Sequence, residues 1–204
     1  MNLVEDRSRG ALVGAAIGNA LAVAPAGSRN AAKVAEFEVS GCIAFLAFVC
    51  DGLIRMYTRA ATRGIGPSVD VVIHALDRWA CSQGRRVYEG PGSRYEGWSH
   101  AQVVSLVRSG YLIEDDRLSR RHRVNRRVLG LVCAGTPLDV PEAARMNAGS
   151  WALLYAVPPR ILYRQEPRRA TAIAVELTQL THDHDAARDA ASSLAACIAA
   201  IVED

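Results

Sequence analysis

The sequence predicts an all-α protein folded as one domain over residues 1–204, and three observations support this prediction. Apolar residues recur at helical spacing along most of the chain. No stretch shows the strict alternation of apolar and polar residues that is typical of a half-buried strand. Half of the 204 residues are hydrophobic, which is enough for a sizeable core, and no repeat or linker-like segment divides the chain.

The first helix is expected at residues 6–21, followed by a loop around residues 25–28. Gly10, Gly14 and Gly18 are four residues apart in this helix, so they lie along one side of it. A ridge without side chains lowers helix propensity but lets a neighbouring helix approach closely. We therefore expect another helix to pack closely against this segment.

The second and third helices are expected at residues 41–62 and from residue 69 onward, separated by a break at residues 64–68. The inward face of the second helix is predicted to carry Ile43, Leu46, Cys50, Leu53 and Ile54. The inward face of the third helix is predicted to carry Val69, Val72, Ile73, Leu76 and Trp79.

The second half of the chain begins with an expected irregular loop at residues 84–97, which are polar and rich in glycine. The last helix is expected to begin after Thr181 as its N-terminal cap, with Asp183 and Asp185 in its first turn, where negative charge complements the helix dipole. Shorter helices are expected at residues 99–109, 121–134, 151–157 and 168–180, with a turn at residues 136–141. The buried stripe of the last helix is predicted to consist of Leu194, Cys197, Ile198 and Ile201.

The composition limits the classes of function and the compartment. A formal net charge of +3 is too small to indicate a nucleic-acid partner by itself. Lys33 is the only lysine, and the excess of arginine, alanine, glycine and valine indicates GC-rich coding of an actinobacterial-like kind. The five cysteines are scattered without a Cys-x-x-Cys pair, which favours buried thiols in a reducing, cytoplasmic compartment.

An apolar run near the N-terminus follows Arg7 and Arg9 and looks superficially like a secretion signal. Glu5 and Asp6 lie where such a signal is positively charged, and Asn19 interrupts the run. A membrane span requires about 20 apolar residues. We therefore expect neither a cleaved signal nor a membrane helix.

The string RGALVGAAIGNAL at residues 9–21 resembles the opening of the ADP-ribosylglycohydrolase family, which typically reads R-G-a-l-l-G-l-a-x-G-D-A-L-G. Later motifs of the family, among them R-W-x-x-x-G, G-x-G-x-x-M-R-x-x-P and T-H-x-H, have counterparts in the same order. These counterparts lie at residues 77–84, 97–98, 125, 134–137, 147–158 and 180–187. The resemblance implies a compact orthogonal helical bundle, here C-terminally shortened.

The resemblance also implies a chemistry, the removal of ADP-ribose from arginine at a pair of divalent metal ions. In the family the metal ligands come from a T-D-D-T motif that opens the second helix and from an aspartate cluster near the C-terminus. Hard cations such as magnesium require several carboxylate oxygens, and two adjacent cations require several acids. Departures from these motifs therefore bear directly on whether the chemistry survives.

The T-D-D-T position matches residues 39–42, where Ser40 and Gly41 replace the aspartates and Cys42 is a soft ligand in a hard-ligand position. The sequence ends at Asp204 without a counterpart of the C-terminal cluster, and Asn19 replaces the aspartate of G-D-A-L. We expect the magnesium pair to be lost and no catalytic residue, metal or other cofactor to remain.

The glycine-rich loop that contains Asn147 and Gly149 departs from the family in a second way. Trp151 falls where small residues would admit the substrate, so it is expected to narrow or fill the pocket. Tyr155 falls where the family often has arginine.

Three groups of residues have a functional and a structural interpretation. Cys42 is either a nucleophile at a helix start or part of a packing contact between small residues. His182 and Asp183, with the two residues after them, are either metal ligands or, as we prefer, the start of a helix. The third group is either a phosphate or nucleic-acid site or a solvated face, and it comprises Arg120, Arg121, Arg123, Arg126 and Arg127.

The leading functional hypothesis is a catalytically inactive ADP-ribosylglycohydrolase-like protein that acts in binding, regulation or scaffolding. Its expected partner is a second copy, most simply in a dimer, or another protein, because a shortened helical fold leaves apolar surface to cover. An ADP-ribose-like ligand is a further candidate partner. The alternatives are a divergent hydrolase with a rebuilt site and an arginine-rich nucleic-acid or phosphate-binding module, of which nucleic acid is disfavoured because few aromatics accompany the arginines.

Overall fold

The structure is a computed structural model of residues 1–204, and it describes residues 10, 12–14, 40–91, 93–134 and 142–203, without the side chains of residues 143 and 199–203. The prediction of an all-α protein is confirmed, because the described residues form helices and no strand. The elements are α2 (Gly41–Arg63), α3 (Asp70–Ser82), α4 (His100–Val107), α5 (Tyr111–Glu114), α6 (Asp116–Ser119), α7 (Arg126–Cys133), α8 (Glu142–Arg145), the 3-10 helix η3 (Ser150–Tyr155), α9 (Val157–Leu162), α10 (Pro167–Gln179) and α11 (Asp185–Glu203).

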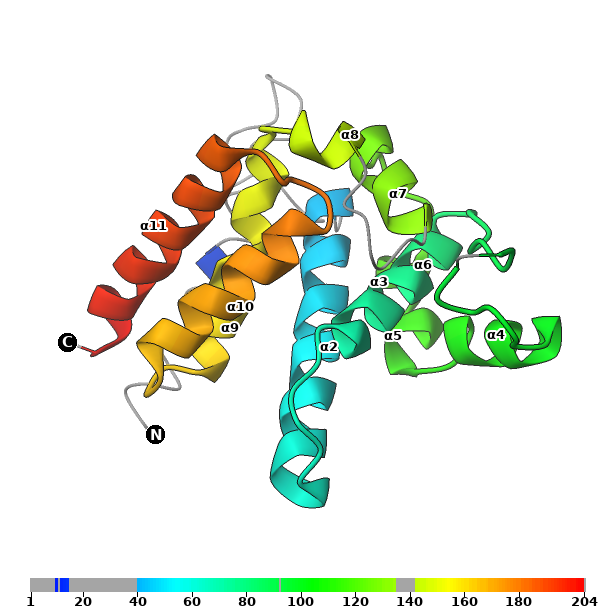
Figure 1. The fold of residues 1–204 in the computed structure, drawn as a ribbon, viewed down its shortest axis with the longest axis horizontal. Coiled ribbons are helices and arrows are strands. Elements are labelled where there is room, and N and C mark those ends of the chain that lie inside the picture. Colours follow the sequence, from blue (N-terminus) through cyan, green and yellow to red (C-terminus); the bar gives the residue numbers. More distant parts are fainter. Residues whose placement is uncertain (1–9, 11, 15–39, 92, 135–141, 204) are drawn as a thin grey trace, which may run out of the picture.

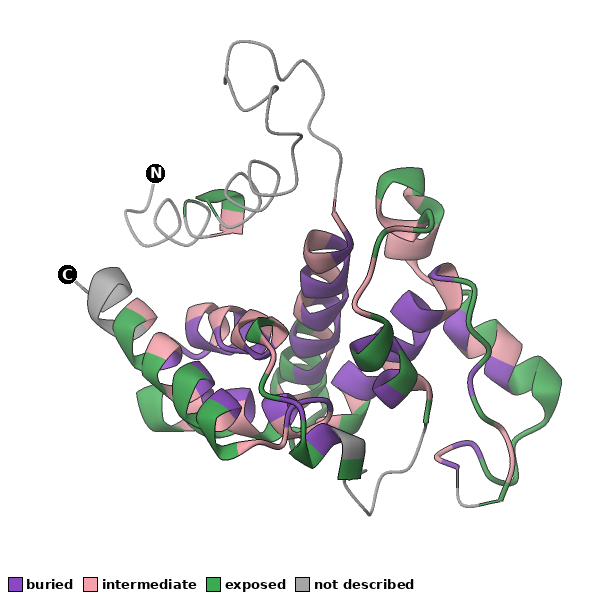
Figure 2. Ribbon diagram, turned by 90° about the horizontal axis from the view of Figure 1, so that it is seen from above, coloured by how far each residue is buried: buried purple, intermediate pink, exposed green. Residues whose placement is uncertain are grey.

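Helix α2 stands at the centre of the molecule, with α9, α10 and α11 on one side and α3 to α7 on the other (Figure 1). Ser40 caps its start through its hydroxyl, and Gly64 ends it in the left-handed conformation with φ 63°. Figure 2 shows buried residues along the upper part of the helix. The central position explains why one helix carries so much of the core.

The buried face of α2 differs from the predicted one. The predicted residue Ile54 is 53% exposed, and Ile43 and Cys50 are only half-buried. The fully buried side chains include Phe45, Phe48 and Val49. The reason is that α2 is covered on two sides, by α3 and by the α9–η3 region, so its buried surface is wider than the single stripe assumed from periodicity.

Helix α3 follows the prediction closely except at Val69, which precedes the helix and is only half-buried. Val72, Ile73, Leu76 and Trp79 are buried, and they pack against α2. The two helices approach so closely at Gly52 that a Cβ there would lie 2.6 Å from the Cα of Val72. The absence of a side chain at Gly52 therefore allows α2 and α3 to pack closely together.

The loop predicted at residues 84–97 is irregular, as expected, but it is anchored in the interior. Tyr95 is fully buried and packs with Val103 and Val107 of α4. Helix α4 begins at a capping box in which Ser99 and Gln102 satisfy each other's backbone N–H groups. A polar composition predicted the loop but gave no sign of its buried tyrosine.

Two predicted helices have different bounds. The helix expected at residues 121–134 begins only at Arg126, where the side chain of Asn125 accepts hydrogen bonds from the backbone N–H groups of Arg127 and Val128. The helix expected at residues 151–157 is a 3-10 helix that starts at residue 150 and continues as α9, with prolines in the first turn of α9.

Helix α11 starts later than predicted, and Thr181 is not its cap. His184 fills that role, because its ring nitrogen accepts a hydrogen bond from the N–H of Ala186. The stripe that α11 buries consists of Ala187, Ala191 and Ala195, whereas the predicted Cys197 is exposed and Leu194 and Ile198 are only half-buried. Alanines let α11 lie close to α10 and η3, and the larger residues fall outside that contact.

Two predictions fall outside the description. Most of the predicted first helix, including Asn19, and the turn at residues 136–141 lie outside the described residues. By length and composition, α2 is the one described helix that could cross a membrane. More than half of its apolar window is buried inside the protein, so its composition is that of a core helix.

Candidate functional site

The first turn of α2 contains residues that match the T-D-D-T position of the resembled family, which supplies one set of its metal ligands. The Ser40 hydroxyl accepts a hydrogen bond from the N–H of Ile43 at 3.4 Å. A Cβ at Gly41 would lie 2.5 Å from the carbonyl oxygen of Arg123 and 2.8 Å from Cγ1 of Val124. The segment before α7 therefore packs directly on this turn, and only glycine fits at residue 41.

Cys42, the one thiol in this turn, is half-buried. The packing of Gly41 on its other side agrees with the structural interpretation of this segment.

A buried polar network lies where the glycine-rich loop meets the start of the last helix. His182 is fully buried, and its Nδ1 lies 2.8 Å from Oγ1 of Thr181. That hydroxyl lies 3.0 Å from the hydroxyl of Tyr155, and Asn147 Nδ2 donates to the Thr181 carbonyl at 2.8 Å. The network ties η3, the loop before it and the segment after α10 into one unit.

The other ring nitrogen of His182, Nε2, is buried and has no hydrogen-bond partner among the described residues. It faces Gly149, where a Cβ would lie 3.5 Å from it and 3.2 Å from Asn147 Oδ1. Burial, with the positive charge of Arg127 as a smaller cause, lowers the pKa of His182 to about 4. The imidazole is therefore neutral at neutral pH and presents one unused polar atom beside the glycine-rich loop.

Trp151 lies next to this network and packs against aromatic side chains of both α2 and α3. Its ring centroid lies 5.5 Å from that of Phe45 in α2 and 6.4 Å from that of Trp79 in α3. Phe45 in turn packs edge-on against Tyr155 at 5.3 Å. The indole is thus part of an aromatic cluster that joins both halves of the molecule.

The four residues 182–185 do not converge on one point. Asp183 accepts a hydrogen bond from Arg188 at 2.6 Å, and Asp185 pairs with the same arginine. His184 caps α11, while His182 is buried in the network. Within the part of the chain that the structure describes, no three His, Cys, Asp or Glu side chains gather as a metal site. The described residues therefore do not fit the magnesium pair of the family.

The arginine run is a packed segment followed by a helix start, not a helical face. Gln83 at the end of α3 holds it, donating to the Arg120 carbonyl and accepting from the N–H of His122. The guanidinium of Arg121 lies over Gly84, and the Arg123 carbonyl lies on the first turn of α2. Exposed side chains of the run include Arg126 and Arg127 in the first turn of α7.

Sequence reasoning missed a second buried network between α3 and the loop after it. The hydroxyl of Tyr95 donates to Oδ2 of Asp77 at 2.5 Å, and Arg94 donates to the same oxygen at 3.0 Å. Burial raises the pKa of Asp77 despite the nearby arginine. Nδ1 of His74 lies 2.9 Å from the Tyr95 hydroxyl. The only local signal for this network is the adjacent Asp77-Arg78 pair, which also belongs to the segment that resembles a family motif.

Helices wrapped around two buried histidine- and tyrosine-containing networks define a helical domain with an enclosed polar site beside a glycine-containing loop. The ADP-ribosylglycohydrolase family model matches residues 1–204, so the chain belongs to that family. No curated protein and no solved structure matches the chain.

Proposed function

We propose that this chain is a catalytically inactive member of the ADP-ribosylglycohydrolase family that serves as a binding, regulatory or scaffold protein and self-associates.

The observation that carries the proposal is the use of the first turn of α2 for packing. Gly41 is in contact with the Arg123 carbonyl, and the Ser40 hydroxyl caps the helix. A carboxylate at residue 41 would collide with a backbone carbonyl and repel it electrostatically. Trp151 supports the same reading, because its indole is engaged with Phe45 and Trp79 in the core.

The test is an assay for release of ADP-ribose from ADP-ribosyl-arginine, with magnesium and with EDTA. We expect the same background release in both conditions, and no heat of magnesium binding by calorimetry. Release that requires magnesium and disappears in His182→Gln would overturn the proposal, because it would show a working metal site near the His182 network.

One observation favours the alternative of a divergent hydrolase. Nε2 of His182 is a buried acceptor without a described partner, next to Gly149. A neutral imidazole of this kind can accept a proton from a bound hydroxyl or water. Magnesium-independent release of ADP-ribose that is lost in His182→Gln, but kept in His100→Gln at an exposed position, would support this alternative.

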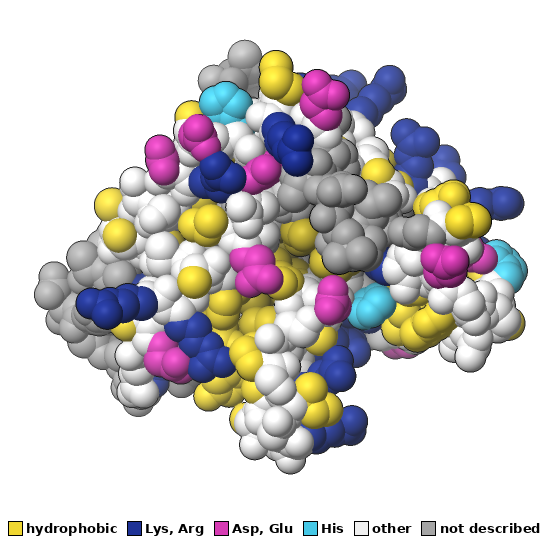
Figure 3. Space-filling view, in the orientation of Figure 1, with side chains coloured by type: hydrophobic (Ala, Val, Ile, Leu, Met, Phe, Trp, Pro, Cys, Tyr) yellow, Lys and Arg dark blue, Asp and Glu magenta, His cyan; other side chains and the backbone are white. Residues whose placement is uncertain are grey.

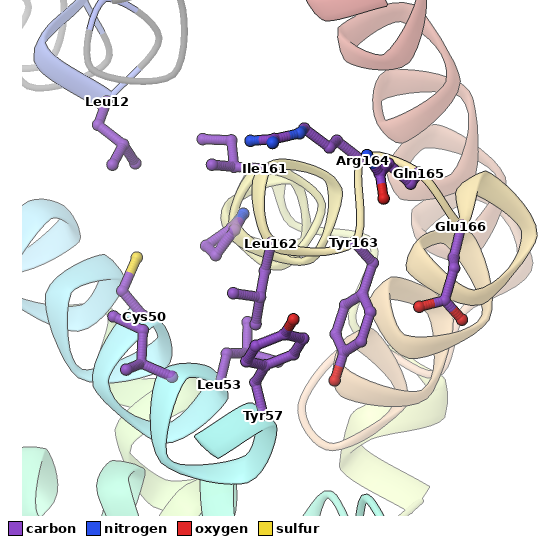
Figure 4. Close-up of a pocket in the computed structure, with 12 residues that line it drawn as sticks. Leu12, Cys50, Leu53, Tyr57, Ile161, Leu162, Tyr163, Arg164, Gln165 and Glu166 are labelled. Carbon is purple, nitrogen blue, oxygen red and sulfur yellow. The ribbon is translucent and has the colours of Figure 1, made fainter. Parts of the chain in front are cut away.

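The self-association in the proposal rests on an apolar groove between α2 and α9. The groove has a volume of about 390 Å³, and Leu53, Tyr57 and Leu162 are among its lining residues (Figure 4). Arg164 and Glu166 lie on its rim. A two-fold axis that passes between Arg164 and Glu166 would bring each residue near the oppositely charged residue of the second copy, so this surface could complement itself.

Light scattering at micromolar concentration tests this part separately. We expect a dimer for the natural sequence and a monomer for Tyr57→Glu, because the new charge would be buried in the contact. Tyr88→Glu is a matched control, since Tyr57 is 45% and Tyr88 47% exposed and Tyr88 lies outside the groove. A natural chain that is monomeric refutes the self-association, as does a dimer that Tyr57→Glu leaves intact.

A further inference from the structure

A second hollow, separate from the networks above, lies between the C-terminal half of α2, α3 and α4. Its volume is about 420 Å³, and its lining includes four arginines and one histidine: Arg55, Arg59, Arg63, Arg78 and His74. Figure 3 shows basic side chains gathered beside the lower part of α2, with a histidine above them. We call this hollow the basic groove.

Nearby acids balance only part of the positive charge of the basic groove. Arg55 and Arg78 share one carboxylate, that of Asp51, at 2.9 Å and 2.7 Å. Arg59 and Arg63 form no ion pair with any residue that the structure describes. The groove therefore has more positive charge than its own carboxylate neutralises.

The spacing of these arginines has an energetic cost. Arg55, Arg59 and Arg63 are four residues apart on α2, and each like-charged pair at this spacing costs about 0.2–0.5 kcal/mol. The helix dipole stabilises the positive charge of Arg63, which lies in the last turn of α2. Arg59 lies one turn earlier, where this stabilisation is weaker. A bound anion would offset the repulsion between these arginines, because each of them would then attract the anion.

The ring of His74 is oriented by its hydrogen bond with the Tyr95 hydroxyl. The Tyr95 hydroxyl gives its proton to Asp77, so toward His74 it can only accept. Nδ1 of His74 is therefore the protonated nitrogen, and Nε2 keeps a lone pair. Burial, with the positive charge of Arg94 as the next cause, lowers the pKa of His74. The groove thus combines cationic donors with one fixed neutral acceptor.

We propose that the basic groove binds a small ligand that carries a phosphoryl group. Arg59 and Arg63 supply the unpaired charge, and Nε2 of His74 accepts from a hydroxyl of the ligand. The volume lies in the range of small-molecule sites, and apolar side chains including Val71 and Leu106 line the same hollow and suit an organic portion.

This site is distinct from the family's own. Arg59 lies 18 residues after Gly41 on the same helix, which places the two about 27 Å apart along its axis. The proposal therefore does not depend on what remains at the first turn of α2, and either can be right alone.

The test is calorimetry with inorganic pyrophosphate as the probe, on the full chain at about 0.15 M salt, where long-range attraction is screened. We expect Arg59→Gln/Arg63→Gln to weaken binding at least about tenfold. Arg145→Gln/Arg168→Gln is the matched control, because it removes the same charge from exposed positions on α8 and α10 outside the groove. Circular dichroism establishes that both variants are folded.

Three results would overturn the proposal: no binding at millimolar pyrophosphate, equal weakening in the control, or an acidic peptide that binds the groove more tightly than pyrophosphate. Nuclear magnetic resonance of the histidine rings gives an independent readout. Pyrophosphate should shift the His74 signals and leave those of His100, which pairs with Glu89 outside the basic groove, unchanged. A shift confined to His100 would contradict the assignment.

Discussion

Replacing Gly52 by alanine tests the closest helix contact in the fold. A Cβ at this position would lie 2.6 Å from the Cα of Val72 and 3.1 Å from the Cβ of Ala75. The nearest atom belongs to the backbone, so no rotamer change can relieve the contact. Helix α3 would have to withdraw by about 0.8 Å to restore an ordinary distance, which loosens the packing of α2 on α3 along its length.

Two opposing effects set the size of the change. Alanine favours a helix over glycine by about 0.8–1 kcal/mol. Overpacking of a tight contact costs about 1–3 kcal/mol, and here it displaces a helix and not a side chain. We expect overpacking to dominate, so that Gly52→Ala lowers the free energy of unfolding by about 1–2 kcal/mol.

The assay is urea unfolding followed by far-ultraviolet circular dichroism, with Gly130→Ala as the control. Gly130 also lies inside a helix, but nothing lies within 4 Å of a Cβ built there. This variant should gain about 0.5–1 kcal/mol from helix propensity alone. If Gly52→Ala were as stable as Gly130→Ala, α2 and α3 would not meet as closely as described.

Three further predictions concern the candidate site and the thiols. The pKa of His182 falls to about 4 on folding, so the free energy of unfolding of the natural chain should fall by up to about 3 kcal/mol as the pH is lowered from 6.5 to about 4. His182→Gln should remove this loss, because glutamine does not take up a proton in this range. Urea titrations across the same pH range measure the difference. Trp151→Ala should lower the free energy of unfolding by about 3 kcal/mol, because the indole joins α2, α3 and η3; a loss below 1 kcal/mol, on the order of an exposed substitution, would contradict its place in the core. Iodoacetamide at neutral pH should label exposed Cys197 before half-buried Cys50, because desolvation and the nearby Asp51 raise the pKa of the Cys50 thiol to about 12. Mass spectrometry showing the reverse order would contradict the raised pKa.

The candidate site was predictable from sequence only in part. Asn147, Gly149 and His182 belong to two separate motifs, and the structure brings them together through Thr181. Periodicity gives no information on such a contact, because it depends on how η3 and the segment after α10 dock. The role of Tyr155 as the partner of Thr181 was also not predictable, since the residue was known only as a departure from a motif.

Charged residues in the interior were the least predictable. Asp51 and Arg78 lie 27 positions apart, and each would be placed on a solvated face by its charge. They are buried because they neutralise each other there, which costs less than burying either alone. Likewise, no local signal places Tyr95 of a glycine-rich loop in hydrogen-bond contact with Asp77.

What the sequence by itself determined is the helical class, the position of α2, α3 and α10, and the loss of acids at the start of α2. These features follow from residue spacing and residue identity, which are local. The tertiary structure decided which face of α2 is buried, that His184 and not Thr181 caps α11, and that unpaired arginines meet His74 in the basic groove. Each of these depends on a second element, because burial and pairing are properties of contacts and not of single segments.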